Sequence, residues 1–323
     1  MLRNRIYRNG RLFAKDVPAE DLSEHLEEPE TLVWVDLCGP AQAELQVVAD
    51  ELALHDLAVQ DALGRRQRPK VDHYAGHIFC AAFQSTLDAA SGAIRLAEVA
   101  AFATPRALVT VRKNQEFDID AVVRRWDDEE DLAVHGVPFL LHGLLDHVVD
   151  SHFETVQALD EATEVLEDLL FDERPRDHQV QRRSFELRKS LVLLRHVVLP
   201  MREVVNTLIR RDWQAVAAPL IPYYQDLYDH VLRVSEWTDS LRDLVSTILE
   251  TNLTIQSNRM NDIMKKVTSW AAIIAVPTAI TGFYGQNVPY PGFGHWVGFV
   301  ASSVLIVAGS AALYGLFRRA GWL

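Results

Sequence analysis

VTSWAAIIAVPTAITGFY, residues 267–284, is a run of 18 residues without a charged side chain. At ~1.5 Å of rise per residue, a helix of this length spans roughly 27 Å, close to the hydrocarbon thickness of a bilayer. A second uncharged run occupies residues 296–317 (WVGFVASSVLIVAGSAALYGLF) and is long enough to span with some tilt. Because only residues 285–295 separate the two runs, the sequence predicts a transmembrane hairpin that follows a much larger extramembrane part.

Basic residues flank this hairpin on one side only. Lys265 and Lys266 precede the first run, Arg318 and Arg319 follow the second, and the connecting loop contains none. By the positive-inside rule, both termini are expected in the cytoplasm and the loop outside. The first thirty residues contain no apolar run of the signal-peptide type, so we expect the large part to remain cytoplasmic at the plasma (inner) membrane.

Pro277 lies inside the first run and removes one backbone hydrogen bond. The carbonyl group that loses its partner must be satisfied by a neighbouring helix or by water, which favours a pore-lining helix over one that faces lipid. Close packing of several copies is favoured by the small and polar residues Ser269, Ala271, Ala272, Ala275, Thr278, Ala279, Thr281 and Gly282. The alternative is a two-helix anchor that conducts nothing, with a sensor or scaffold in the cytoplasm.

Composition narrows the function classes. The net charge of −13 argues against a nucleic-acid partner and favours a surface that concentrates cations. Two cysteines, Cys38 and Cys80, are too few for a disulfide framework, and we expect both to be core thiols. No glycine-rich phosphate loop and no nucleophile with a base at useful spacing occurs. We therefore expect neither an enzyme nor an organic cofactor.

The residue pattern before the hairpin changes near residue 136. Residues 1–135 contain β-type runs at 31–37 (TLVWVDL), 78–86, 94–103 and 107–111, which predict a cytoplasmic α/β domain with an antiparallel or mixed sheet. Residues 136–221 predict a pair of long helices, and residues 222–266 a stalk helix without a break before Pro277. The remaining parts are transmembrane helix 1 (267–284), an outer loop (285–295), transmembrane helix 2 (296–317) and a basic cytoplasmic tail (318–323).

Gly285, Gln286 and Asn287 follow the first run directly. Gly285 leaves room for close backbone approach. A ring of Asn287 amide oxygens and backbone carbonyls would suit a cation that keeps its water shell, and Mg²⁺ dehydrates reluctantly. On spacing alone, a Gly-Asn turn between two helices explains this tripeptide equally well.

Several motifs in order resemble the CorA family of divalent-cation transporters. The segment YGQN (284–287) is similar to the family signature Tyr-Gly-Met-Asn, and the chain ends in the basic FRRAGWL (317–323). The likeness extends to QRPKV (67–71), YQDLYDH (224–230), LRDL (241–244) and SNRMN (257–261). The resemblance implies an α+β membrane protein that forms a funnel-shaped homopentamer, with an N-terminal α/β domain and a stalk helix that becomes the pore-lining span.

The same resemblance implies roles for single positions. The selectivity filter is implied at Gly285, Gln286 and Asn287. The inner pore, the hydrophobic gate and a polar ring are implied at Asn261, Met264, Val267 and Thr278. A regulatory Mg²⁺ ion is implied between Asp88 of one subunit and Asp226 of the next. Bundle packing remains the alternative for Met264 and Val267, and solvated acids for Asp88.

Two departures from the family pattern concern ion preference. Gln286 replaces the Met of the signature, and the outer loop has no acid where the family has a Met-Pro-Glu segment. The implied function is uptake of Mg²⁺, with Co²⁺ or Ni²⁺ as further ions, driven by the membrane potential and gated by cytoplasmic Mg²⁺. The alternative within transport is a ZntB-like zinc carrier, with or without proton coupling, in which His295 is an outer zinc ligand.

Overall fold

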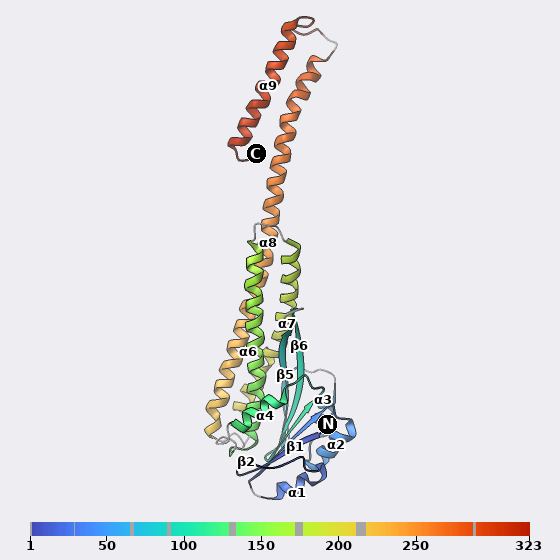
Figure 1. The fold of residues 1–323 in the computed structure, drawn as a ribbon, viewed down its shortest axis with the longest axis vertical. Helices are drawn as coiled ribbons and strands as arrows, with labels where there is room; N and C mark the ends of the chain where they lie inside the picture. The colour runs from blue at the N-terminus through green and yellow to red at the C-terminus, as the bar shows by residue number, and fades with distance from the viewer. Residues whose placement is uncertain are drawn as a thin grey trace. The chain divides into compact units, whose positions relative to one another are not determined.

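The computed structural model describes residues 2–28, 30–64, 68–88, 92–128, 134–171, 177–210, 218–286 and 289–323. The chain forms two compact units, Met1–Ile248 and Leu249–Leu323. Figure 1 shows the elements of both units along the chain. The helix α8 (Ile221–Tyr284) begins in the first unit and ends in the second.

The first unit is built on a mixed β-sheet. Its described strands lie in the order β2-β1-β3-β7-β6-β5-β4, and β3 and β7 are the pair that runs parallel. The strands are β1 (Leu2–Arg8), β2 (Arg11–Lys15), β3 (Thr31–Cys38), β4 (Lys70–Tyr74), β5 (His77–Asp88), β6 (Ala93–Ala103) and β7 (Ala107–Arg112). The sequence left an antiparallel or a mixed sheet open, and the sheet is mixed. The predicted runs at 31–37, 78–86, 94–103 and 107–111 are found as β3, β5, β6 and β7.

An apolar core covers each face of this sheet. Along β3, Trp34 enters one core while Val33 and Val35 enter the other, because successive side chains of a strand point to opposite faces. One core is closed by α1 (Leu22–Glu27), α2 (Gln42–Glu51) and α3 (Asp56–Leu63). The other is closed by α4 (Ile119–Asp128), α6 (Val137–Leu170), α7 (Asp177–Arg210) and the first turns of α8.

The three long helices start and end close to where the sequence pattern predicts. Helices α6 and α7 are each 34 residues long, and α8 continues for 64 residues without a break. Pro200 and Pro277 lie inside α7 and α8 without ending them. Within the first unit, Tyr224 of α8 donates a hydrogen bond to the Pro138 carbonyl at 2.8 Å, which fastens the start of α8 to the start of α6.

The second unit consists of the rest of α8 and of α9 (Trp296–Arg319). In the described part of the chain, these are the two helices that are long and apolar enough to cross a membrane. In each of the two helices, only 6% of the apolar 18-residue stretch is buried, whereas the core helix of a soluble protein is mostly buried. The C-terminal Trp322 stacks on Phe317 with ring centroids 5.6 Å apart.

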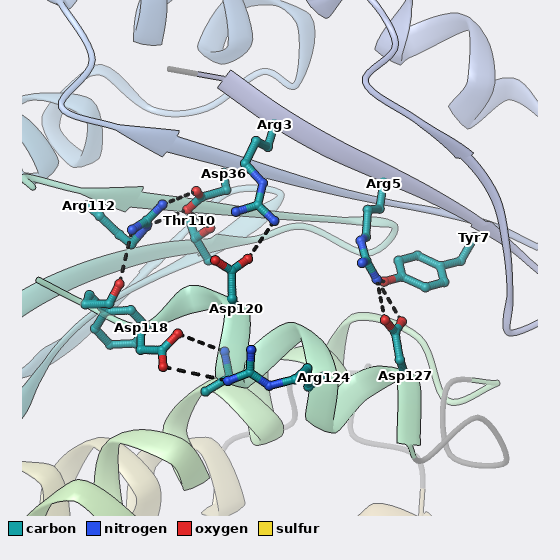
Figure 2. A network of polar contacts seen from close by, with 12 residues as sticks. Arg3, Arg5, Tyr7, Asp36, Thr110, Arg112, Asp118, Asp120, Arg124 and Asp127 are labelled. Atoms are coloured by element: carbon teal, nitrogen blue, oxygen red, sulfur yellow. Dashed lines mark hydrogen bonds and ion pairs between the residues drawn. The ribbon is translucent and has the colours of Figure 1, made fainter. Parts of the chain in front are cut away.

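Helix α4 is fastened to the sheet by ion pairs, which Figure 2 shows. Arg3 of β1 lies 2.8 Å from Asp120, and Arg5 of the same strand lies 2.7 Å from Asp127. In the same region, the buried Arg112 donates a hydrogen bond to the Phe117 carbonyl at 3.1 Å, just before α4 begins. These contacts position the connection between the sheet and the long helices.

Candidate ion pathway and regulatory acids

The membrane part of α8 has two distinct faces. On one face, Val276 lies against α9, because its Cγ1 atom would lie 3.0 Å from a Cβ added at Gly309. Ser269, on the same face, is fully buried. The opposite face carries Met264, Val267 and Thr278, all of them exposed in the single chain. Met264 is 56% exposed and Val267 58% exposed. Since a helix advances by 3.6 residues per turn, these three predicted pore residues share the face that α9 leaves uncovered.

Thr278 has the chemistry of a weak cation ligand. Its hydroxyl donates to the Ile274 carbonyl at 3.0 Å, so the hydroxyl proton is engaged within the helix. The lone pairs of the Thr278 oxygen remain available as acceptors. A ring of such oxygens from several copies could contact the water shell of a passing cation.

At the other end of this helix face, Asn261 and Met264 line an open groove together with Trp322. The groove has a volume of about 580 Å³. Asn261 and Met264 therefore both lie toward the C-terminal segment at this end of α8. Around the helix, Asn261 is about a third of a turn from Val267 and Thr278, and Met264 lies between them. Its neighbour Lys265 forms an ion pair with Asp262 at 3.1 Å.

The Gly-Gln-Asn tripeptide begins where α8 ends. The Gly285 N–H donates to the Thr281 carbonyl at 2.9 Å, and the Gln286 N–H donates to the Phe283 carbonyl at 3.3 Å. A Cβ added at Gly285 would lie 3.0 Å from the Thr281 oxygen, so a side chain here would crowd the helix end. Both Gly285 and Gln286 are exposed. The third residue of the predicted filter, Asn287, lies outside the described residues.

The outer loop holds an aromatic cluster that sequence reasoning missed. The Tyr290 ring lies 4.9 Å from that of Tyr284 and 5.3 Å from that of Phe293. The loop then turns tightly: a Cβ added at Gly298 would lie 2.6 Å from the Gly292 oxygen. Gly292 has φ +91°, a conformation that favours glycine. The dense aromatic and glycine content of residues 289–298 was the available signal.

The two predicted regulatory acids lie on different elements. Asp88 ends β5, where its carboxylate lies 3.6 Å from Arg95. Asp226 lies near the start of α8; its side chain is 69% exposed and 3.7 Å from His230. Among the described residues of the single chain, no group of three or more His, Cys, Asp or Glu side chains could hold a metal ion.

One acidic pair on α6 has a different role from the one its spacing suggests. Asp146 and Asp150 follow His142 at four-residue spacing, a pattern that can bind a metal ion. From the sequence alone, scattered polar residues on an exposed helix face explain this spacing better. The Arg125 guanidinium lies 2.9 Å from Asp146 and 2.7 Å from Asp150. Burial raises the pKa of Asp146, Arg125 opposes this shift and Asp150 adds to it. The two carboxylates therefore clamp α4 onto α6.

The fold defines a class of protein. It is a membrane protein with two spans, in which one continuous helix joins an α/β domain to a transmembrane hairpin. The chain belongs to the CorA-like Mg²⁺ transporter protein family, whose pattern matches residues 29–319. Members of this family are ion transporters. The resemblance to this family is thereby confirmed, and so is the predicted fold of an N-terminal α/β domain, a long helix and two apolar C-terminal helices. The homopentamer and the Gly-Gln-Asn signature stay predictions.

Individual relatives match most of the chain. The cobalt/magnesium transport protein CorA of Thermotoga maritima is 29% identical over 298 residues, which cover 91% of this chain and 84% of that protein. The protein of the same name from Methanocaldococcus jannaschii is 25% identical over 320 residues, with 96% and 98% covered. A complete structure of the CorA magnesium transporter from M. jannaschii has a TM-score of 0.77 at 23% identity, covering 92% of this chain and 93% of that one, and it shows the shared fold.

The zinc alternative rests on a more distant likeness. The zinc transport protein ZntB of Yersinia pestis is 26% identical over 242 residues, which cover 71% of this chain and 69% of that protein. His295 is exposed at the start of α9, where its backbone N–H donates to the Gly292 carbonyl at 3.1 Å. Its imidazole therefore lies at the loop. Among the described residues, no group of three or more His, Cys, Asp or Glu side chains that could hold a metal ion includes it.

Proposed function

We propose that this protein carries divalent cations across a membrane through a pore lined by α8. The observation that carries the proposal is the helix face formed by Met264, Val267 and Thr278, which lies opposite the α9 contact and is exposed in the single chain. Copies of α8 arranged around an axis would bury this face and place the Thr278 oxygens in the pore. Membership of a family of CorA-like Mg²⁺ transporters supports this arrangement.

Mg²⁺ is the first proposed ion, with Co²⁺ and Ni²⁺ as further cargo. The names of two relatives, cobalt/magnesium transport proteins, support Mg²⁺ and Co²⁺. The chemistry of the outer mouth agrees: Gly285, Gln286 and Asn287 offer carbonyl and amide oxygens and no carboxylate. Such a filter suits an ion that passes with its water shell.

The proposed assembly is a homopentamer in the plasma membrane, with both termini in the cytoplasm. The basic residues Lys265, Lys266, Arg318 and Arg319 on one side of the hairpin support this orientation. An inside-negative potential then drives a dication inward, because each charge gains ~2.3 kcal/mol per 100 mV. No organic cofactor is needed for such passive flow.

Gating by cytoplasmic Mg²⁺ is the finer part of the proposal. Asp226 has an exposed carboxylate, and its 3.7 Å contact with His230 is too long for a hydrogen bond. Asp88 lies at the end of β5, with its carboxylate 3.6 Å from Arg95. A Mg²⁺ ion held by Asp88 of one subunit and Asp226 of the next would stabilise the closed state of the pentamer. Loss of the ion would leave two carboxylates that repel each other and so destabilise that state.

Ion flux into proteoliposomes that contain the full chain tests the proposal. We expect Mg²⁺ entry under an inside-negative potential and its loss in Asn287→Ala, while Val307→Ala, at an exposed position of α9, retains it. A non-conducting scaffold would show no flux in either case. Zinc entry without Mg²⁺ entry, following a proton gradient, would instead establish the ZntB-like alternative and make His295 the next residue to replace.

A further inference from the structure

A polar groove of about 880 Å³ lies on the first unit, beside the contact between α7 and β4. Arg202, Asn206 and Arg210 line one wall; because they are spaced by four residues, they lie along one face of α7. Arg68 and Lys70 line the other wall, at the beginning of β4.

This groove gathers positive charge on a chain whose net charge is −13. Lys70 is neutralised within the protein, since its ammonium lies 2.6 Å from Asp61 and 2.7 Å from Asp72. The guanidinium groups of Arg68, Arg202 and Arg210 form no ion pair in the described part of the chain. The described lining includes a single acid, Glu203.

Among the described residues, these three guanidinium groups have no acidic partner, which is unusual in a protein of net charge −13. Each guanidinium presents a planar fork of N–H donors that pairs with two oxygens of one phosphate group. The space is of the size that holds a small organic ligand. Leu199, Pro200 and the ring of the half-buried Tyr228 add an apolar wall, and Arg202 Nε donates to the Tyr228 hydroxyl at 3.3 Å.

We propose that this groove binds a polyphosphate anion of the size of a nucleoside triphosphate. Arg68, Arg202 and Arg210 hold the phosphate oxygens, and Tyr228 with Leu199 and Pro200 contacts the remainder of the ligand. Three guanidinium groups offset most of the charge of a triphosphate, whereas a single carboxylate would leave two of the arginines uncompensated. The site is separate from the α8 face that carries the proposed transport, and its existence does not depend on that function.

The test uses the full chain in detergent, titrated calorimetrically with ATP, inorganic tripolyphosphate and adenosine in the presence of EDTA. We expect both polyphosphates to bind and adenosine not to bind. The double variant Arg202→Ala/Arg210→Ala should weaken binding at least tenfold, and higher salt should weaken binding to the unaltered protein. Arg182→Ala is the matched control, because this arginine lies on α7 outside the groove and is 82% exposed.

Each outcome decides for or against the site. Tighter binding of ATP than of tripolyphosphate supports a contact between the nucleoside and Tyr228; equal binding supports recognition of the phosphate chain alone. Unchanged affinity in the double variant overturns the proposal. Absence of polyphosphate binding, together with altered subunit assembly of the double variant in native mass spectrometry, also overturns it and identifies the groove as a contact between copies of this chain.

Discussion

Arg112 and Asp36 form a bidentate ion pair across the parallel strands β7 and β3. Arg112 Nε lies 3.0 Å from Asp36 Oδ1, and Nη2 lies 2.6 Å from Oδ2. The two side chains are 7% and 0% exposed. Thr110 donates to the same carboxylate at 2.9 Å. Burial lowers the pKa of Arg112, but the hydrogen bonds that Arg112 donates to Asp36 and the charge of that carboxylate outweigh it, so the net pKa of Arg112 is raised.

Replacing Asp36 with Ala should lower the free energy of unfolding by about 3–5 kcal/mol, because a buried guanidinium would lose its counter-charge. Denaturant unfolding of the full chain in detergent, followed by tryptophan fluorescence, measures this. Asp243→Ala is the control: its side chain is 73% exposed and paired with Arg242, so a change below about 1 kcal/mol is expected. Equal losses in both variants would contradict a special role for the buried pair.

His152 should make the protein less stable in acid. Burial lowers its pKa to about 4, although the hydrogen bond from Nε2–H to the Phe83 carbonyl, 2.8 Å long, opposes the shift. In the unfolded chain a histidine titrates near 6.5, so between these values the unfolded state binds more protons and unfolding becomes easier as the pH falls. The full effect below pH 4 is on the order of 3 kcal/mol.

The variant His152→Gln keeps a donor for the Phe83 carbonyl and removes the titration. Its melting temperature should therefore fall less steeply than that of the unaltered chain between pH 6.5 and 4. His196→Gln, at an exposed position of α7, serves as the control and should follow the unaltered chain. Parallel curves for all three proteins would show that His152 does not govern acid sensitivity.

Val267 should control leak through the proposed pore. Shortening this exposed apolar side chain to Ala widens a hydrophobic constriction and lets water enter more readily, so Mg²⁺ flux should rise severalfold when internal Mg²⁺ is high. Val307→Ala removes the same atoms from an exposed position of α9 and should leave flux unchanged. If both variants behave alike, Val267 does not line the gate.

Two glycines of the hairpin should differ in their tolerance of a methyl group. Gly298→Ala would place Cβ 2.6 Å from the Gly292 backbone oxygen, which cannot easily move, and we expect a loss of about 1–3 kcal/mol. Gly309→Ala meets only the Val276 methyl group at 3.0 Å, which can adjust by a small rotation. Thermal unfolding in detergent should rank Gly298→Ala well below Gly309→Ala; the reverse order would contradict the tight turn of the loop.

Asp226 should take part in inhibition by internal Mg²⁺. Asp226→Ala removes one carboxylate of the proposed intersubunit clamp, so flux at millimolar internal Mg²⁺ should rise severalfold. Asp229→Ala removes an exposed acid of the same helix and should retain inhibition. Unchanged inhibition in Asp226→Ala would exclude this residue from the sensor.

Local sequence patterns were sufficient for most of the helices. The number of consecutive uncharged residues predicts the two spans, because the thickness of the bilayer sets how many apolar residues a helix needs to cross it. The absence of a helix-breaking residue before Pro277 predicts the continuous α8. The longer apolar strands β3, β5, β6 and β7 were predicted as well. The strands β1, β2 and β4 were missed, because charged residues within each of them mask the alternation of apolar and polar side chains.

By itself, then, the sequence determined the α/β domain, the long helices, the transmembrane hairpin and the family, since each depends on neighbours within one or two turns or on motifs in order. The tertiary structure alone decided which side chains meet. Asp36 and Arg112 are 76 positions apart, and Arg125 reaches Asp150 over 25. Strand pairing and helix packing bring such residues together, as they bring Arg68 to Arg202 and Arg210, because a side chain's charged partners depend on its neighbours in space.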